Sequence, residues 1–464
     1  MGLAFTAVSI VGFAQYETVK IIEQTGKVRV DSIIIAGNII THRNIIRREF
    51  HFQEGDSIVA SNLNYELEQV QHQIYNTTLF VHVIVQAQMI TKSNCRITVS
   101  VKERWYIFPI PQFQLVARSF NEWISKYHGT LDRVNYGVNF TDNNITGRKD
   151  KLKLTLINGF SQNISALYTL PYLDQHLVAG FSIGSGYFRT REIPFYTNNT
   201  NQQVFYRKDV YITQTWNVNA SYSIRKAIVK KEILRFRYTV MTVPDSITNV
   251  LNVSFFNSSS SVKSIPDISY QIYKDNVDNV MYPLKGQSTR LFLLKRGLGL
   301  SGGINMLSVY GEYDHYYDLG GKWYSGITVQ AQLKFPFEQP YINQRAMGFE
   351  ENYMRGLELY VIDGVAYAMG RLNLKKEIAH FTLPGITRSK VYHRIPFRLF
   401  AKTFNDIGYV YANKKLAGML NNTLLYTGGF GLDIVTIYDF HLRLEYSFNQ
   451  LKQNGLFLHN GSGL

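Results

Sequence analysis

The stretch FRLFAKTFNDIGYVYA, residues 397–412, alternates between apolar and polar side chains with a period of two. One face carries Phe397, Leu399, Ala401, Thr403, Ile407 and Tyr409. The other face carries Arg398, Lys402 and Asp406. Because successive side chains of a β-strand point to opposite faces, this stretch predicts a strand with Asp406 on its polar side.

The same period recurs in residues 151–156, 327–335 and 440–448. Between residue 105 and residue 464, turn-rich stretches separate about 16 such runs, each about ten residues long. Segments of this length with one apolar and one polar face are typical of a membrane barrel with lipid outside and a polar lumen. We therefore expect residues 105–464 to form a transmembrane β-barrel of about 16 antiparallel strands.

The composition agrees with this prediction. The chain is 45% hydrophobic and 14% aromatic, with 32 Tyr and 29 Phe, and aromatic rings gather at the two membrane interfaces of such barrels. No run of 18 apolar residues occurs, which excludes an ordinary transmembrane helix. In lipid only a closed barrel then satisfies every backbone group, and the alternative is a soluble protein.

The formal net charge is +15, with a pI near 9.5. The basic residues are spread over strands and loops rather than clustered on one helix or stripe, so we expect no nucleic-acid partner. A polar lumen and anionic lipid headgroups both accommodate such charge.

The N-terminus suggests export. Residues 3–14 are apolar and short, and a polar segment begins at Tyr16, which predicts a signal peptide over residues 1–15. The usual basic residues before the apolar stretch are missing, so the alternative is a segment of another kind. Cys95 is the only cysteine, which excludes an intrachain disulfide and a cysteine-based metal site.

Residues 28–104 follow a different pattern. A strand over 28–35 is followed by a helical stretch that Thr41 is expected to cap, and by a second helix on which Leu63, Leu67, Val70 and Ile74 share one face. Two further strand-like runs cover 79–86 and 96–103. The order strand, helix, helix, strand, strand predicts one small α/β domain.

This module resembles a POTRA domain, the periplasmic unit of the BamA/TamA superfamily of outer-membrane assembly and translocation barrels. The resemblance rests on residues 30–33 with Gly37-Asn38, on the turn at 54–56, and on residues 78–80 and 99–103. It continues into the barrel at residues 144–148, 168–172 and 275–286. The resemblance implies a bacterial outer-membrane protein with one POTRA domain in the periplasm.

The family has a Val-Arg-Gly-aromatic motif in a long loop that folds back into the barrel lumen. Here it reads Met354-Arg355-Gly356-Leu357, which keeps the Arg-Gly pair and lacks the aromatic residue. The partner motif Phe-x-Asp-x-Gly is present as Phe404, Asp406 and Gly408. A single POTRA domain, the missing aromatic residue at Leu357 and a short last strand distinguish this chain from the central assembly factors of the family.

An arginine in a water-poor lumen needs an acceptor, and a guanidinium pairs best with a carboxylate. We expect Asp406 to be that acceptor, with Glu377 as a second one. Gly356 lets the loop backbone turn, and Gly408 leaves room beside it. The alternative is that Arg355 is a solvated loop residue and Asp406 an ordinary lumen carboxylate.

Protein insertion would use the seam between the first and last barrel strands, because an exposed strand edge accepts an incoming strand. The first strand contains Phe108, Pro109 and Pro111, and the prolines lack ladder donors. The last candidate strand, residues 455–460 with Leu456 and Phe457, is short. We predict a weak seam; alternatively, the prolines mark a strand start and the chain end is frayed.

The strand over residues 79–86 offers a second edge, with Val81, Val83 and Val85, to which an unfolded client could add. The alternative is that the POTRA domain is only a spacer that anchors the barrel.

No catalytic motif with the required context occurs, and the 11 histidines are scattered, so we expect no enzymatic activity, no metal and no cofactor. The resemblance implies a factor that assembles or inserts nascent outer-membrane proteins, with outer-membrane lipid as its surroundings. One alternative is a pore that translocates a dedicated secreted polypeptide. The other is a structural subunit of an envelope complex.

Overall fold

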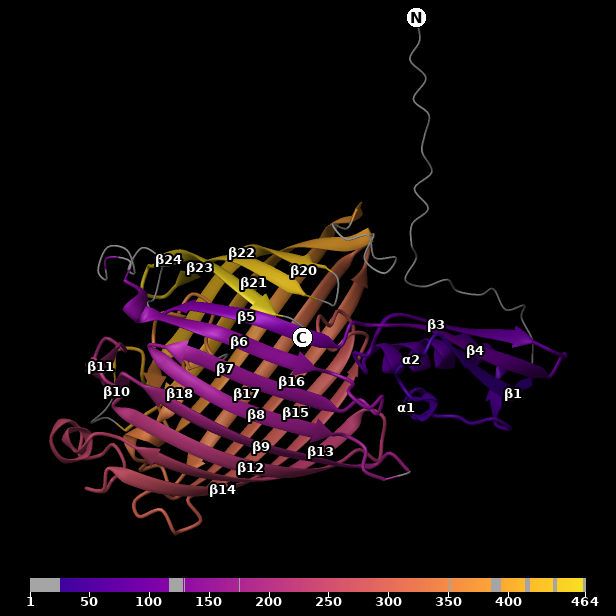
Figure 1. Cartoon of the computed structure of the whole chain (residues 1–464). Helices are drawn as coiled ribbons and strands as arrows, with labels where there is room; N and C mark the ends of the chain where they lie inside the picture. The colour runs from indigo at the N-terminus through magenta and orange to yellow at the C-terminus, as the bar shows by residue number, and fades with distance from the viewer. Residues whose placement is uncertain are drawn as a thin grey trace, which may run out of the picture.

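A computed structural model describes residues 26–116, 128, 130–174, 176–349, 352–384, 394–413, 418–436 and 440–461 of the chain. Within these residues, a small N-terminal α/β domain lies against one end of a large barrel (Figure 1). The expected signal peptide, residues 1–15, falls outside the described residues.

The N-terminal domain is one sheet with two α-helices. Its elements are β1 (Lys27–Ala36), α1 (Arg43–Arg47), β2 (Ser57–Val59), a 3₁₀ turn (Ala60–Asn62), α2 (Leu63–Tyr75), β3 (Phe80–Met89) and β4 (Asn94–Glu103). The strand order is β2-β1-β4-β3, with β1 parallel to β4 and the other pairs antiparallel. The predicted order of elements is correct, and the structure adds the short strand β2.

The apolar spacing of α2 sets the core of this domain. The predicted face Leu63, Leu67, Val70 and Ile74 is buried. The expected cap of α1 is wrong. His42 is the N-cap residue and makes no side-chain cap bond, whereas the hydroxyl of Thr41 contacts the hydroxyl of Tyr106 at 3.0 Å.

Sixteen strands form the barrel sheet in the described part of the chain. They are β5 (Ile107–Leu115), β6 (Val134–Asp142), β7 (Lys151–Gly159), β8 (Ser161–Leu170), β9 (Ala179–Thr190), β12 (Thr213–Ile224), β13 (Lys230–Thr242), β14 (Val262–Val277), β15 (Gly286–Arg296), β16 (Met306–Gly320), β17 (Trp323–Phe335), β20 (Ala366–Pro384), β21 (Arg394–Tyr411), β22 (Leu424–Val435), β23 (His441–Asn449) and β24 (Asn454–Gly461). Each pairs antiparallel with its neighbour in this order.

Two short hairpins lie in loops outside the barrel sheet. They are β10 (Glu192–Thr197) with β11 (Gln203–Arg207), and β18 (Arg345–Met347) with β19 (Ile362–Asp363).

Side-chain burial along β21 follows the predicted alternation. Six residues of one parity are buried: Phe400, Lys402, Phe404, Asp406, Gly408 and Val410. The residues between them, such as Ile407 at 53% exposure, face outward. This outward face carries no charged residue, although Thr403 and Asn405 on it are polar, and the inward face carries Lys402 and Asp406. The distribution of charge is the one expected for a barrel with lipid outside.

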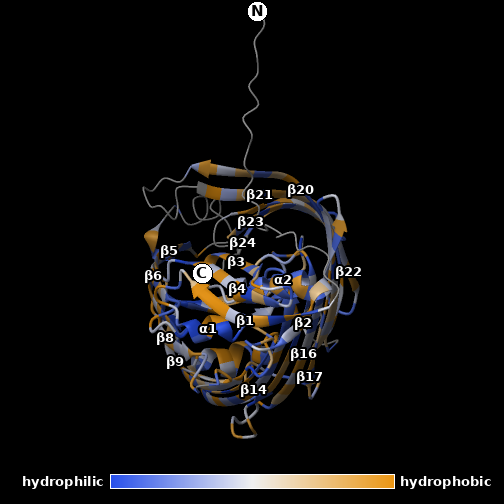
Figure 2. Ribbon diagram, turned by 90° about the vertical axis from the view of Figure 1, so that its right-hand side faces the viewer, coloured by the Kyte–Doolittle hydropathy of each residue, from blue (hydrophilic) through white to orange (hydrophobic). Residues whose placement is uncertain are grey.

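The N-terminal domain lies in front of one mouth of the barrel (Figure 2). It contacts the turns that join β6 to β7, β8 to β9 and β12 to β13. The long connections, including the one from β17 to β20, leave the opposite end. Among the described residues, no helix has both the length and the apolarity needed to cross a membrane.

Candidate functional site in the barrel lumen

The connection from β17 to β20 turns back into the barrel, and its residues 352–361 are called the lumen loop below. Arg355 lies in this loop and is 8% exposed. Its Nε donates to Oδ2 of Asp406 at 3.0 Å, its Nη2 donates to Oδ1, and its backbone N–H reaches Oδ2 at 3.2 Å. Asp406 is 2% exposed, so a two-pronged, buried ion pair joins the lumen loop to β21.

Three further groups surround the guanidinium of Arg355. Its carbon lies 4.1 Å from the ring centre of Phe404, a distance at which the ring face attracts a cation. Its Nη1 donates to Oδ1 of Asn373 at 2.5 Å and lies 3.9 Å from the carboxylate of Glu445. Residues of β20, β21 and β23 therefore hold one arginine together.

A side chain would be strained or crowded at both glycines of the paired motifs. Gly356 has φ +85°, a conformation that other residues rarely adopt, and its carbonyl accepts from Asn449 at 2.7 Å. At Gly408 a Cβ would stand 2.9 Å from the sulfur of Met354. Met354 and Leu357 are both 2% exposed, so Leu357 fills the place of the missing aromatic residue with buried apolar volume.

Glu377 is not the second acceptor that the sequence predicted. Its carboxylate pairs instead with Arg398 on β21, with a shortest distance of 2.6 Å. Alternation along β20 correctly predicted that Glu377 faces inward, but a shared face does not give the position along the barrel axis. Asn373 and Glu445 take the place that was assigned to Glu377.

The lumen loop also contacts the last strand. The hydroxyl of Tyr353 lies 3.0 Å from Nδ1 of His459 on β24, and the two rings stack. Nε2 of His459 lies 3.6 Å from the carboxylate of Glu358 and 3.4 Å from that of Glu445. The same loop that is tied to β21 is thus tied to β24 as well.

A chain of charged groups continues from Arg355 toward the N-terminal domain. The ammonium of Lys402 lies 2.7 Å from Glu445 and 2.5 Å from Asp433. Lys375 lies 3.5 Å from the same Asp433, which is 0% exposed. Alternation predicted that Lys402 lies on the polar face of its strand, but no sequence signal connected Lys402 or Glu445 to Asp433.

The turn between β14 and β15 meets this charge chain from the opposite direction. Tyr282 in this turn is 3% exposed and donates to Oδ2 of Asp433 at 2.7 Å. Its ring lies 5.3 Å from that of Phe400. The side-chain amide of Asn76, at the end of α2, donates to the carbonyl of Val277 at 2.9 Å and accepts from the N–H of Val280 at 3.1 Å. A turn held by the N-terminal domain therefore packs into the lumen.

The two ends of the barrel sheet are β5 and β24. In the part of the chain that the structure describes, β5 shares a ladder with β6 only, and β24 with β23 only. The ladder between β5 and β6 runs through both Pro109 and Pro111. Since proline has no N–H, the nitrogens of both residues belong to the other edge, which faces β24.

The last strand exposes its apolar side chains. Leu456 is 65% exposed, whereas Phe457 is half-buried and pairs with Glu445 in the ladder. On the first strand, Phe108 is half-buried and pairs with Thr141. These seam residues lie where the sequence placed them, on the first and last barrel strands.

The family model for POTRA, described as "Surface antigen variable number repeat", matches residues 28–104. Residues 28–104 are a POTRA domain. The match covers the sheet and both α-helices that lie at the barrel mouth. No curated protein matches the chain in sequence.

Solved structures share the fold over 94% of the chain. BamA from Haemophilus ducreyi lacking POTRA domains 1–3 superimposes with a TM-score of 0.52 at 16% identity, over 94% of this chain and 84% of that one. CdiB from Escherichia coli also gives a TM-score of 0.52, at 12% identity, over 94% of this chain and 75% of that one. The fold class predicted from the sequence is confirmed, and the POTRA match over residues 28–104 agrees with the resemblance stated for that module.

A buried ion pair joins the POTRA domain to the barrel rim. Both carboxylate oxygens of Glu49, which is 0% exposed, accept from Arg225 at 2.5 and 2.7 Å. Arg225 also donates to the hydroxyl of Tyr172 at 2.9 Å. Burial by itself would lower the pKa of Arg225, but the charge and hydrogen bonds of Glu49 outweigh it, and the net pKa is raised. Arg225 therefore stays charged in this joint.

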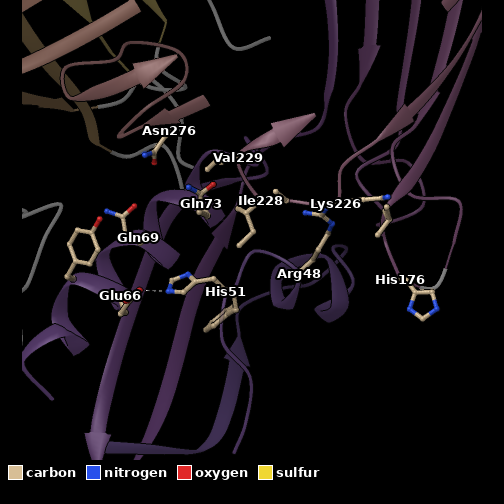
Figure 3. Close-up of a pocket in the computed structure, with 14 residues that line it drawn as sticks. Arg48, His51, Glu66, Gln69, Gln73, His176, Lys226, Ile228, Val229 and Asn276 are labelled. Carbon is tan, nitrogen blue, oxygen red and sulfur yellow. Dashed lines mark hydrogen bonds and ion pairs between the residues drawn. The ribbon is translucent and has the colours of Figure 1, made fainter. Parts of the chain in front are cut away.

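A cleft of about 620 Å³ remains open beside that joint (Figure 3). Gln69 and Gln73 of α2 line one side, and Lys226 and Ile228 of the turn between β12 and β13 line the other. The POTRA domain thus touches the rim at separate points rather than along a continuous face.

The strand β3 is an edge of the POTRA sheet. The prediction that an unfolded client could add to this strand requires such an edge. The side chains of Val83 and Val85, however, are 4% and 8% exposed and belong to the domain core, and Val81 is half-buried. The N–H of Val85 donates to the side chain of Gln71 at 3.2 Å. A client would therefore meet the β3 backbone rather than these valines, and part of that backbone is already bonded.

Proposed function

We propose that this protein assembles or inserts outer-membrane proteins by strand pairing at the seam between β5 and β24. In this proposal the barrel lies in a bacterial outer membrane, the POTRA domain lies in the periplasm, and no cofactor or nucleotide takes part. The observation that carries the proposal is the pair of sheet ends: no ladder joins β5 to β24 in the described residues.

The physical driving force would come from the backbone of the client. In lipid an unpaired N–H or C=O has no water to bond, so a strand edge is costly until another strand covers it. When a client strand pairs with β24, the unpaired backbone N–H and C=O groups at the edges of both chains form hydrogen bonds. Burial of the client's apolar face in lipid then adds a favourable term at each further strand.

The prolines of β5 support a directional seam. Pro109 and Pro111 remove two donors from the edge that faces β24, which weakens closure at that edge. The edge of β24 carries no proline. A client is therefore expected to pair with β24 first, where a full set of donors and acceptors is present.

The filled lumen favours lateral insertion over a translocation pore. The lumen loop packs Met354 and Leu357 against the inner wall, and Tyr282 does so from the opposite end. A pore for a dedicated secreted polypeptide would require both segments to leave. A structural subunit of an envelope complex would require neither segment to move and no opening at the seam.

In this proposal the Arg355–Asp406 pair acts as a lock on the seam. The lumen loop contacts β21 through Arg355 and β24 through Tyr353, so its position sets the position of the last strand. A buried ion pair is weak evidence for stability but can select one conformation. The selected conformation here is the one with β24 held against the lumen loop.

A disulfide across the seam tests the proposal. Cysteine pairs scanned between residues 107–115 and 454–461 should include one that bridges β5 to β24, and that oxidised protein should lose insertion of a client barrel into proteoliposomes. The matched control is the pair Tyr446→Cys and Leu456→Cys, two residues that are already partners within the ladder of β23 and β24. Unchanged insertion with a closed seam refutes strand pairing there.

Depletion of the protein in cells separates the rival functions. An assembly factor should cause a broad loss of barrels from the outer-membrane proteome. Loss of one exported protein, with other barrels retained, would identify a translocation pore instead. A structural subunit should co-purify with its complex at fixed stoichiometry and should tolerate the closed seam.

A further inference from the structure

The loop from β1 to α1, residues 37–42, carries two exposed isoleucines beside the barrel rim. Ile39 is 88% exposed and Ile40 is 50% exposed. Single apolar side chains on a surface are ordinary. Two adjacent ones at the junction of a soluble domain and a membrane barrel raise the question of what covers them.

Hydrogen bonds hold this loop in place. The carboxylate of Glu103 accepts from the backbone N–H groups of Ile40, at 3.0 Å, and of Thr41, at 2.7 Å. The amide of Asn144, in the turn between β6 and β7, donates to the hydroxyl of Thr41 at 3.0 Å. The N–H of His42 donates to the carbonyl of Gly147 at 2.9 Å. The backbone that carries the two isoleucines is therefore fixed by hydrogen bonds to Glu103 and to the turn between β6 and β7.

Gly147 shows how closely the loop approaches the barrel. Its φ is +79°, and a Cβ at this position would stand 2.2 Å from the carbonyl oxygen of Ile40. Only a glycine allows this approach without moving one of the two backbones. The loop thus lies directly against the turn at which β6 ends and β7 begins.

The outward face of the barrel continues toward this loop. Ile107 on β5 is 44% exposed, and Trp105, two residues earlier and in phase with it, is 58% exposed. Ile145, in the turn between β6 and β7, is 43% exposed. A tryptophan just outside the end of a spanning strand is typical of a membrane–water interface. We call Ile39, Ile40, Trp105 and Ile145 the rim patch.

Cationic side chains stand next to the rim patch. Arg43 is exposed, and Arg148 is half-buried in the turn that also contains Ile145. Apolar side chains flanked by basic residues fit a bilayer surface, where the apolar groups enter the acyl boundary and the cations meet anionic headgroups.

From this arrangement we propose that the rim patch docks on the phospholipid leaflet that faces the POTRA domain, with anionic lipid as its partner. The leaflet then fixes the POTRA domain at a second place, in addition to the Glu49–Arg225 joint. This inference rests on the barrel spanning a membrane and not on the insertion activity, so it stands or falls separately from the proposed function.

Cys95 makes a direct test simple, because this single cysteine is 0% exposed and leaves an introduced thiol as the only accessible one. The full-length variant Ile39→Cys is labelled with a polarity-sensitive fluorophore and reconstituted in vesicles that contain phosphatidylglycerol. The control is Ile90→Cys, which replaces an isoleucine of 47% exposure directly after β3. The C-terminal end of β3 points away from the barrel (Figure 1). The unsubstituted chain reports any labelling of Cys95.

At position 39 the emission should move to shorter wavelength, and phospholipids brominated near the headgroup should quench it. At position 90 the emission should remain that of a label in water. Arg43→Glu should reduce the quenching at position 39, and so should replacement of phosphatidylglycerol by zwitterionic lipid.

Two results would overturn the inference. Equal emission and equal quenching at positions 39 and 90 would mean that the rim patch stays in water. A shift to shorter wavelength without quenching by brominated lipid would mean that protein, such as a second copy of the chain, covers it. Client insertion is measured on the same vesicles, so loss of insertion with retained quenching counts against the proposed function alone.

Discussion

Substitution of Arg355 by alanine should release the lumen loop without unfolding the barrel. The side chain makes two bonds to Asp406, one to Asn373 and a ring contact with Phe404. Removal of one partner of a buried pair costs about 3–5 kcal/mol, because the carboxylate left behind is buried without its partner. Asp406, at 2% exposure, has no access to water that would lower this cost.

The change in energy converts into a rate of proteolysis. At about 1.4 kcal/mol per factor of ten, 3–5 kcal/mol raises the released population of the loop by about 140- to 3,700-fold. When opening is fast relative to cleavage, the cleavage rate follows that population. Limited proteolysis in detergent should therefore cut Arg355→Ala within residues 336–365 at least about 100-fold faster than the parent chain.

Controls separate release of the loop from loss of the fold. Heat-modifiable migration on a gel reports whether the barrel is intact before digestion. Arg345→Ala removes an exposed arginine from the same connection and should change the rate by less than about threefold. The double variant with Asp406→Ala should be cut no faster than Arg355→Ala, because the unpaired buried charge is then gone. A cleavage rate within a factor of two of the parent would refute the lock.

Three further predictions concern the joints around the POTRA domain. Glu49→Ala leaves the charge of Arg225 buried without its partner and should destabilise the joint by about 3–5 kcal/mol. The measurement is faster proteolysis between residues 104 and 107. Arg47→Ala, which removes an exposed ion pair, should change the stability of the joint by less than about 0.5 kcal/mol. Tyr282→Phe leaves a buried carboxylate without one donor and should lower the unfolding free energy in detergent by about 1–3 kcal/mol; an unchanged transition would contradict that contact. Gly147→Ala places a Cβ 2.2 Å from a backbone oxygen, so a disulfide engineered between the POTRA loop and the turn should form more slowly than in the parent, and an equal rate would contradict the close approach.

Local patterns predicted most of the fold for a clear reason. Burial along β21 has a period of two because one side of the strand meets lipid and the other a polar lumen. The polarity of each side chain therefore indicates which side it faces. The buried face of α2 was predictable from the sequence as well, because Leu63 and Ile74 recur at helical spacing and face one core. The residue type of Thr41 suits a helix cap, which is why the sequence predicts one. In the structure its hydroxyl contacts Tyr106 and Asn144 instead, and α1 has no side-chain cap bond.

The candidate site was only partly predictable. Arg355 and Asp406 were paired through motif resemblance, and the structure brings the two residues together. Glu377 was assigned to the same arginine because it faces inward, yet it pairs with Arg398 at another height in the lumen. Parity along a strand gives the face of a residue but not its height, which depends on the tilt and stagger of every strand before it.

The sequence by itself determined the barrel, the α/β domain before it and the inward face that holds Asp406, because alternation and amphipathic spacing are local properties of the chain. Only the tertiary structure decided that Asp433 meets Tyr282, that Glu445 meets both Lys402 and His459, and that no ladder joins β5 to β24 in the described residues. These partners lie far apart in the sequence, and closure of a tilted sheet around the lumen sets which of them face one another.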